Sequence, residues 1–301
     1  MSAVTIPKVC KAAVVRNPGK DYTIETIEDF PVPVPGPGQL LLKLNCTGLC
    51  MSDHHFMLGD WGQGMSCEVS GHEGAGAVVA LGPGVDPEVW KLGDRAGVKP
   101  IWDTCHECEL CGGVGHFGTQ YGKALGIRVL AIDTGEEKRK MCMELGAEAF
   151  IDFMTCPDVT EEVKKITGGG AHGVIVTGGT AAAYKTAPYF LRKCGVQVCV
   201  GLPPCPLKTY QSILRFATDS PVTSVGAAMA GMDPFLLIFL KLTITGSLVG
   251  GQTQVNEALE MAARGLIEPR ITVLPFKDFP IGLATLVQSK AAGRIVIDYN
   301  L

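Results

Sequence analysis

The feature that most constrains the fold is an alternation of short apolar runs and helix-like segments in the later part of the chain. It begins at a Gly-x-Gly-x-x-Gly motif formed by Gly113, Gly115 and Gly118. The pattern then predicts helices at 119–125, 136–145, 160–166, 181–193 and 254–264, and strands at 128–133, 149–153, 173–177, 196–201 and 242–248. An alternation of this length predicts an α/β domain with a doubly wound parallel sheet.

The glycine motif gains its meaning from its surroundings, because the motif alone occurs by chance in a chain with 38 glycines. Here a helix follows the motif, an apolar strand follows the helix, and that strand ends at Asp133, 20 residues after Gly113. The glycines let a pyrophosphate approach the backbone at a helix N-terminus, and the acid can hold ribose hydroxyls. The pattern therefore predicts a dinucleotide site, and Asp133 favours NAD because its charge would repel the 2′-phosphate of NADP.

Residues 1–100 have a different character, with short β-prone runs separated by segments rich in Pro and Gly. The runs are 11–15, 40–47, 75–81 and 95–98. Such spacing predicts a compact, barrel-like, β-rich domain. Two further predicted strands, 271–276 and 294–298, have a helix between them and would return to it. The 301 residues suffice for the two domains that we expect, 1–111 with 270–301 and 112–269.

Composition excludes several classes of protein. The net charge of −4 without a basic block argues against a nucleic-acid partner. The most apolar window, Phe235 to Leu240, is six residues long, far too short to span a bilayer. Residues 1–16 show no secretory signal, and twelve cysteines without such a signal indicate reduced thiols and metal sites in the cytoplasm.

A second constellation, between Cys50 and Glu73, indicates metal chemistry. Cys50, His72 and Glu73 offer a thiolate, an imidazole and a carboxylate, the ligand types of a catalytic zinc site that keeps one position open. A zinc ion there could polarise a carbonyl or lower the pKa of a bound alcohol. Taken singly, Cys50 and His72 would more often be core residues than ligands.

The spacing around these residues resembles a known family. Cys-x-Ser-Asp-x-His from Cys50, then Gly-Asp-Trp, then Gly-His-Glu-Gly-x-Gly, is similar to the zinc-dependent medium-chain alcohol dehydrogenases, most of all the fungal ones. In that family the Cys and the His bind the catalytic zinc, and the Glu is a nearby or alternate ligand. The resemblance also implies a chaperonin-10-like catalytic domain before a Rossmann domain.

The resemblance assigns roles to further residues. Asp53 would hydrogen-bond His72 and fix its tautomer. Ser52 would receive the substrate's hydroxyl proton and pass it through the cofactor ribose to His55. Trp61 would wall the substrate pocket, although an ordinary packed Trp is an equal alternative, and Lys138 would contact the adenosine ribose.

One position departs from the family pattern. Met51 stands where the family usually has a His or Arg that reaches the cofactor pyrophosphate. The loss of that cationic contact should weaken cofactor binding.

Cys105, Cys108 and Cys111 indicate one half of a structural zinc site, because two-residue gaps place thiols on a tight turn. The family has a fourth Cys eight residues further on, but position 119 is Thr. Only three thiols are present, so His106, Glu107 or water would have to complete the coordination.

Two irregularities separate the chain from the family pattern. No apolar run lies between Cys111 and Gly113, so a block that would carry the fourth structural Cys, the third catalytic ligand (a Cys) and the first, central strand of the Rossmann sheet is missing. Its absence would leave the strands that end at Asp133 and begin at Gly173 with unpaired edges. Residues 208–230 form an unusually long extra stretch. A lost exon and a retained intron would explain both.

The sequence therefore predicts an NAD-dependent, zinc-dependent alcohol dehydrogenase or aldehyde reductase, with a role in fungal secondary metabolism as one option. Its partners would be a small alcohol or aldehyde and, as in relatives, further copies in a dimer or tetramer. Two alternatives stay open. One is a degenerate, catalytically impaired member that only binds zinc. The other is a zinc-free quinone or enoyl reductase, which the retained thiolate and imidazole disfavour.

Overall fold

The computed structural model describes residues 5–60, 65, 67–98, 115–201, 233–247, 251–288 and 290–301. The chain divides into two compact units, one formed by Met1–Asp103 and Arg270–Leu301 and the other by Thr104–Pro269. The predicted boundary between 111 and 112 lies outside the described residues. The predicted Cys105, Cys108, Cys111, Gly113, Trp61 and the stretch 208–230 also lie outside them.

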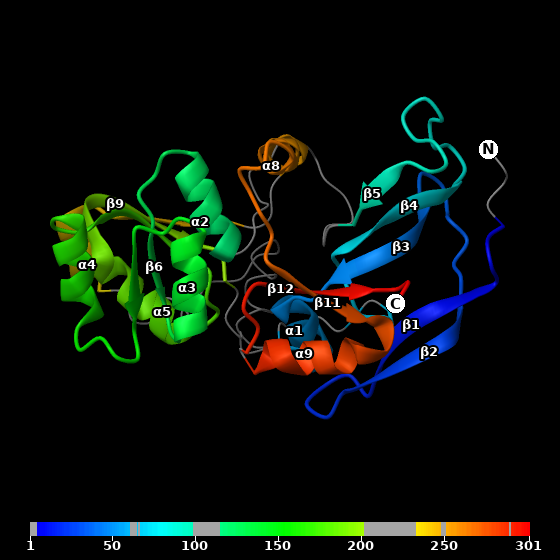
Figure 1. Ribbon diagram of the computed structural model, residues 1–301, viewed down its shortest axis with the longest axis horizontal. Coiled ribbons are helices and arrows are strands. Elements are labelled where there is room, and N and C mark those ends of the chain that lie inside the picture. The colour runs from blue at the N-terminus through cyan, green and yellow to red at the C-terminus, as the bar shows by residue number, and fades with distance from the viewer. Residues whose placement is uncertain are drawn as a thin grey trace, which may run out of the picture. The chain divides into compact units, whose positions relative to one another are not determined.

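The first unit is built on antiparallel β-structure. Strands β1 (Val9–Arg16) and β2 (Thr23–Pro31) form a hairpin pair. A five-stranded sheet has the order β11-β12-β3-β4-β5. Its strands are β3 (Leu40–Gly48), β4 (Gly74–Leu81), β5 (Arg95–Gly97), β11 (Ile271–Pro275) and β12 (Arg294–Asp298). The C-terminal strand β12 thus lies inside the sheet, parallel to β11 and antiparallel to β3 (Figure 1).

Helices α1 (Met51–Leu58) and α9 (Phe279–Val287), with the short helix η3 (Phe276–Asp278), close the core of this unit. Their apolar side chains meet those of β1 and β12 in one cluster, whose buried members are Ala13, Val15, Leu49, Met57, Phe276, Phe279, Leu283, Ile295 and Ile297. Burial of this surface is the main source of stability of the unit. Leu49 lies just before α1 and Met57 lies in its last turn. The core therefore fixes both ends of the segment that carries Cys50.

The second unit alternates helices with parallel strands, as predicted. Its helices are α2 (Gly115–Ala124), α3 (Glu136–Glu144), α4 (Val159–Thr167), α5 (Ala181–Thr186), α7 (Pro234–Leu240) and α8 (Gln252–Ala263). Its strands are β6 (Leu130–Asp133), β7 (Ala149–Asp152), β8 (Ala171–Val176), β9 (Leu191–Cys199) and β10 (Thr243–Gly246). Together with the mixed sheets of the first unit, this arrangement confirms the predicted α/β class.

The described strands of the second unit form two separate sheets rather than one. Within the part of the chain that the structure describes, β6 pairs only with β7, and β8, β9 and β10 form a three-stranded sheet with β9 in the middle. A doubly wound sheet would place one central strand between the strand that ends at Asp133 and the strand that contains Gly173. Among the described residues no strand takes that place, as the sequence predicted. Side-chain packing still joins the two sheets, because Ile132 of β6 and Val174 of β8 belong to one apolar cluster.

Two of the predicted elements need correction. The helix predicted at 181–193 ends at Thr186, a 3-10 turn (η1, Ala187–Phe190) follows, and β9 begins at Leu191. Pro188 explains the break, because proline lacks the N–H that a continuing helix would use. The helix predicted from residue 119 begins already at Gly115, so Gly118 lies within α2 rather than in a preceding turn.

The split sheet predicts uneven amide protection. In the described structure, residues 196–199 of β9 pair with strands on both sides, whereas residues 173–176 of β8 pair on one side only. Hydrogen–deuterium exchange should therefore be faster at 173–176 than at 196–199, because unpaired strand edges open to solvent more readily. Equally slow exchange in both segments would show that the free edge of β8 is covered.

Candidate metal centre

The candidate site is assembled at the start of α1 and at the entry to β4. Cys50 is the N-cap of α1, and Asp53, in the first turn, accepts a hydrogen bond at Oδ2 from the Cys50 backbone N–H at 3.0 Å. An acid at this position stabilises the helix start, where N–H groups lack partners. No helix is predicted over 51–58 from the sequence, so this local reason for Asp53 becomes visible only in the structure.

The same carboxylate reaches across to the second ligand. His72 Nδ1–H donates to Asp53 Oδ1 at 2.6 Å, and the Asp53 side chain is only 2% exposed. His72 follows Gly71, whose φ of +117° is a conformation that side-chain-bearing residues avoid. Asp53 therefore fixes the backbone of Cys50 and the ring of His72 at once, and it leaves His72 Nε2 directed to the other ligands.

Three potential ligand atoms converge at this point. One atom each from Cys50, His72 and Glu73 lies within 4.8 Å of the other two. Glu73 Oε1 is 3.8 Å from His72 Nε2. A soft sulfur, an imidazole nitrogen and a carboxylate oxygen form a donor set that suits zinc. The residues present therefore fit the metal that the sequence predicted.

The electrostatics of Cys50 favour a thiolate. Burial alone would raise its pKa, but hydrogen bonds from His72 and Ser52 and the positive charge of Arg294 outweigh burial and lower the pKa of the thiol from 9.0 to about 7. The Ser52 hydroxyl oxygen lies 3.6 Å from Cys50 Sγ, within hydrogen-bond distance of a sulfur. A thiolate is the form in which Cys binds a metal.

His72 has the opposite shift. Burial would lower its pKa, but hydrogen bonds to Asp53 and Cys50 outweigh burial and raise the pKa to about 9. At a pH between these two pKa values, about 7 for Cys50 and about 9 for His72, a thiolate and an imidazolium therefore face each other in the metal-free protein. A metal would replace the proton on His72 Nε2, so its binding would release protons.

The other residues predicted on α1 lie around this centre. Ser52 and His55 are three positions apart and share one face of the helix. His55 Nδ1 is hydrogen-bonded to Asp60 Oδ2 at 2.7 Å, which leaves Nε2 as the proton-accepting nitrogen when the ring is neutral. Asp60 had no assigned role in the sequence, because a partner just beyond the helix end is visible only in the structure.

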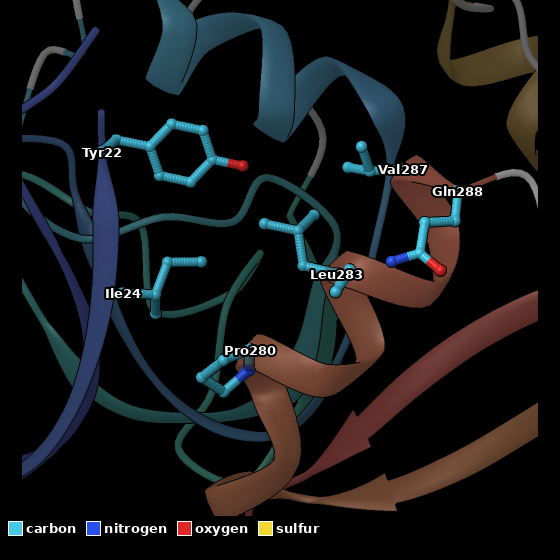
Figure 2. Close-up of a pocket in the computed structure, with 7 residues that line it drawn as sticks. Tyr22, Ile24, Pro280, Leu283, Val287 and Gln288 are labelled. Atoms are coloured by element: carbon cyan, nitrogen blue, oxygen red, sulfur yellow. The ribbon is translucent and has the colours of Figure 1, made fainter. Parts of the chain in front are cut away.

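The neighbouring His54 contacts Tyr22 rather than the candidate metal ligands. Its Nδ1 bonds the hydroxyl of Tyr22 at 2.7 Å, and burial, with the charge of His55, lowers the pKa of His54. Tyr22 also lines a hollow of about 290 Å³ between β2 and α9, together with Ile24, Leu283 and Val287 (Figure 2). The lining is apolar except for Tyr22 and Gln288, so this hollow offers no set of metal ligands.

The predicted dinucleotide residues lie in the second unit. Gly115 begins α2 and Gly118 is its fourth residue, so the N-terminus of α2 stands at the motif. Asp133 ends β6, and its Oδ1 accepts hydrogen bonds from Lys138 Nζ and from the Thr134 backbone N–H, both at 2.8 Å. The structure thus brings Asp133 and Lys138 together in an ion pair at the end of β6. Their pairing also reduces the negative charge that would face a 2′-phosphate.

Among the described residues, every helix is too short or too polar to cross a lipid bilayer.

Solved structures show what class of fold this is. A structure titled as an NAD-dependent alcohol dehydrogenase matches with a TM-score of 0.76 and 20% identity, over 96% of this chain and 99% of that one. A mycobacterial quinone oxidoreductase matches with a TM-score of 0.69, also at 20% identity and over 96% of this chain and 99% of that one. At such identities the likeness defines the fold alone, which this chain shares with these two oxidoreductases.

Sequence relatives place the chain more narrowly. Residues 113–264 match the family described as zinc-binding dehydrogenase. An alcohol dehydrogenase of Schizosaccharomyces pombe is 30% identical over 99% of this chain and 100% of its own length, and alcohol dehydrogenase 1 of Emericella nidulans is 30% identical over 98% and 99%. The chain belongs to the medium-chain alcohol dehydrogenase family.

The relatives also bear on the missing block. The match to the Schizosaccharomyces pombe protein extends over 374 positions, at least 73 more than the 301 residues of this chain. The relative therefore has residues without a counterpart here, in line with the predicted deletion. The family match at 113–264 does not include Cys50, His72 or Glu73, so their role rests on their geometry.

The ion pair at the site predicts an unusual thiol reactivity. In metal-free protein, alkylation of Cys50 by iodoacetamide should rise with a midpoint near pH 7. His72→Ala removes the strongest interaction that favours the thiolate, so the midpoint should move up toward 9.0. Mass spectrometry of the Cys50 peptide measures the rate at each pH. An identical midpoint in both proteins would contradict the pairing, once circular dichroism has shown that the variant is folded.

Proposed function

We propose that the chain is an NAD-dependent, zinc-dependent alcohol dehydrogenase that interconverts an alcohol and its aldehyde or ketone. The observation that carries this proposal is the convergence of Cys50, His72 and Glu73 ligand atoms within 4.8 Å around a ring that Asp53 orients. The names of the two fungal relatives support the reaction class. A zinc ion held by these residues would supply a Lewis acid for the substrate oxygen.

The chain's own residues would manage the proton. In the oxidation direction, the alcohol loses a hydride to NAD⁺ and its hydroxyl proton to the protein, and the carbonyl compound and NADH are the products. Ser52 Oγ, next to Cys50 Sγ, would accept that proton. His55, on the same face of α1, would release it at Nε2, because Asp60 holds Nδ1. The resemblance implies that the cofactor ribose links the two.

The second unit would bind the cofactor. The N-terminus of α2 would face the pyrophosphate, and Asp133 with Lys138 would hold the adenosine ribose. Asp133 favours NAD, and Lys138 moderates that preference. Met51, in place of the family's usual cation, would make binding of either cofactor weaker than in relatives.

Three further expectations, on the cellular compartment, the oligomeric state and the substrate, belong to this proposal. Each cysteine in the described part of the chain is a free thiol, which agrees with the expected reducing cytoplasm. Helix α7 exposes Phe235, Ile238 and Phe239 at 68%, 80% and 67%, a surface that a second copy in a homo-oligomer could cover. A larger aldehyde of fungal secondary metabolism is one possible substrate, beside short alcohols.

The metal proposal predicts a graded loss of function. Asp53→Asn should lower zinc affinity and the rate of aldehyde-dependent NADH oxidation about 10–100-fold, because outer-shell carboxylates orient metal-bound histidines. Cys50→Ala should abolish both. Zinc analysis of the dialysed protein and an NADH assay over an aldehyde panel measure the two quantities, with Asp86→Asn on the surface as the matched control.

Two outcomes would decide against an active zinc enzyme. A wild-type protein with neither zinc nor saturable NADH binding would support the degenerate alternative. NADH-dependent quinone reduction that is unaffected by Cys50→Ala would support a zinc-free reductase.

The cofactor proposal predicts opposite effects of two neighbouring residues. Asp133→Ser should reduce the preference for NADH over NADPH by roughly 10-fold, about 1.4 kcal/mol, because it removes the charge that repels the 2′-phosphate. Lys138→Met should increase the preference, because it removes the cation that reduces this charge. Equilibrium dialysis with both cofactors measures the ratio. Shifts of the same sign in both variants would contradict the assignment.

A further inference from the structure

A residue far away in the sequence completes the candidate metal centre. Strand β12 pairs with β3 in an antiparallel register that sets Val296 opposite Gly48 and Ile297 opposite Thr47. Continued by two residues, this register brings Arg294, at the start of β12, beside Cys50. The Arg294 side chain is 15% exposed, so its charge acts in a partly buried site. Nothing in the sequence pattern connects Arg294 with the cluster.

Arg294 holds one oxygen of Glu73 and leaves the other in place for a metal. Its Nη2 donates to Glu73 Oε2. The second oxygen, Oε1, is the one that lies 3.8 Å from His72 Nε2. A guanidinium that takes Oε2 therefore fixes the rotation of the carboxylate, and Oε1 faces the ligand cluster.

The backbone leaves room for this arrangement. A Cβ atom on Gly48 would lie 2.3 Å from Glu73 Oε2 and 3.1 Å from Arg294 Nη2. Any side chain at position 48 would therefore displace the carboxylate or the guanidinium. The Gly48 N–H also donates to the Glu73 backbone oxygen at 3.1 Å, so this glycine anchors the residue whose side chain it accommodates.

We infer that Arg294 is a positioning residue that makes Glu73 the third protein ligand of this chain's metal site. The inference rests on the proposed function. Arg294 would orient Glu73 in the same way that Asp53 orients His72. Each forms a charged hydrogen bond with the ligand side chain at the atom that does not face the metal. Glu73 thereby takes the place of the cysteine ligand that the chain lacks.

If Arg294 had a competing role, its removal would change the metal affinity in the opposite direction. If its cation merely neutralised Glu73 and kept the carboxylate from the metal, removal of Arg294 would strengthen metal binding. If it orients the carboxylate, removal would weaken binding. The sign of the change in affinity therefore separates the two roles.

The test uses cobalt(II) as the probe in the full-length, metal-free protein. Cys105, Cys108 and Cys111 can also bind cobalt, so the part of the thiolate-to-cobalt absorption band that Cys50→Ala removes reports binding at Cys50. Competition with a chromophoric chelator, followed on that part of the band, gives the affinity. Arg294→Met should weaken cobalt binding roughly 10–100-fold, and Arg294→Lys should recover part of the loss. Arg16→Met, which removes an exposed ion-pairing arginine of the same unit, should leave the affinity unchanged.

A double-mutant cycle identifies the group through which Arg294 acts. In a Glu73→Gln background, Arg294→Met should have little further effect, because the carboxylate it orients is already gone. Gly48→Ala keeps the Arg294 side chain but separates the carboxylate from the guanidinium by displacing one of them, so it should reproduce the loss even if Arg294→Met fails to fold. Unchanged or tighter cobalt binding in the folded Arg294→Met protein, or additive effects in the cycle, would overturn the inference.

Failure of the proposed function would look different. In that case the wild-type protein itself would show no cobalt band that Cys50→Ala removes, and the inference would fall with it. A band in the wild type with no loss in the Arg294 and Gly48 variants would overturn the inference alone.

Discussion

The candidate site depends on one buried carboxylate. Asp53 accepts from the Cys50 backbone N–H with one oxygen and from the His72 ring with the other. A buried charge is costly unless it is paired and hydrogen-bonded, and here both oxygens have partners. The same two hydrogen bonds thus stabilise the buried charge of Asp53 and hold Cys50 and His72 in position. The hydrogen bond to Asp53 helps to raise the pKa of His72, and the hydrogen bond from His72 in turn helps to lower the pKa of Cys50.

The two units differ in how completely their described strands are hydrogen-bonded into a continuous sheet. In the first, β12 inserts between β11 and β3, so a strand from the end of the chain completes the sheet beside the candidate metal centre. In the second, the described strands keep their apolar packing, with Ile132 and Val174 in one cluster, but not a continuous hydrogen-bond ladder. A family member that lacks its central strand would have this topology. The first unit therefore supports the candidate chemistry more fully than the second supports cofactor binding.

The sequence predicted what local patterns encode. Periodicity and glycine spacing gave the α/β class and most strands, including Arg294–Asp298 with its observed bounds. Cys50, His72 and Glu73 were predicted as ligands because they lie in compact motifs, and the structure brings their ligand atoms together. Local sequence patterns could not predict the register of β12 against β3, and this long-range pairing brings Arg294 to Glu73. The helix at 181–193 was wrong because the apolar spacing obscured the effect of Pro188.

The proposed centre places a metal between Cys50 and His72, with Glu73 as its third protein ligand. Zinc K-edge absorption spectroscopy can test this arrangement on a protein in which Cys105, Cys108 and Cys111 are changed to Ser so that only this centre can bind. The proposed ligand set predicts one sulfur at about 2.3 Å and the remaining ligands as nitrogen or oxygen at about 2.0–2.1 Å. A first shell without sulfur, or a protein that retains no zinc, would contradict it.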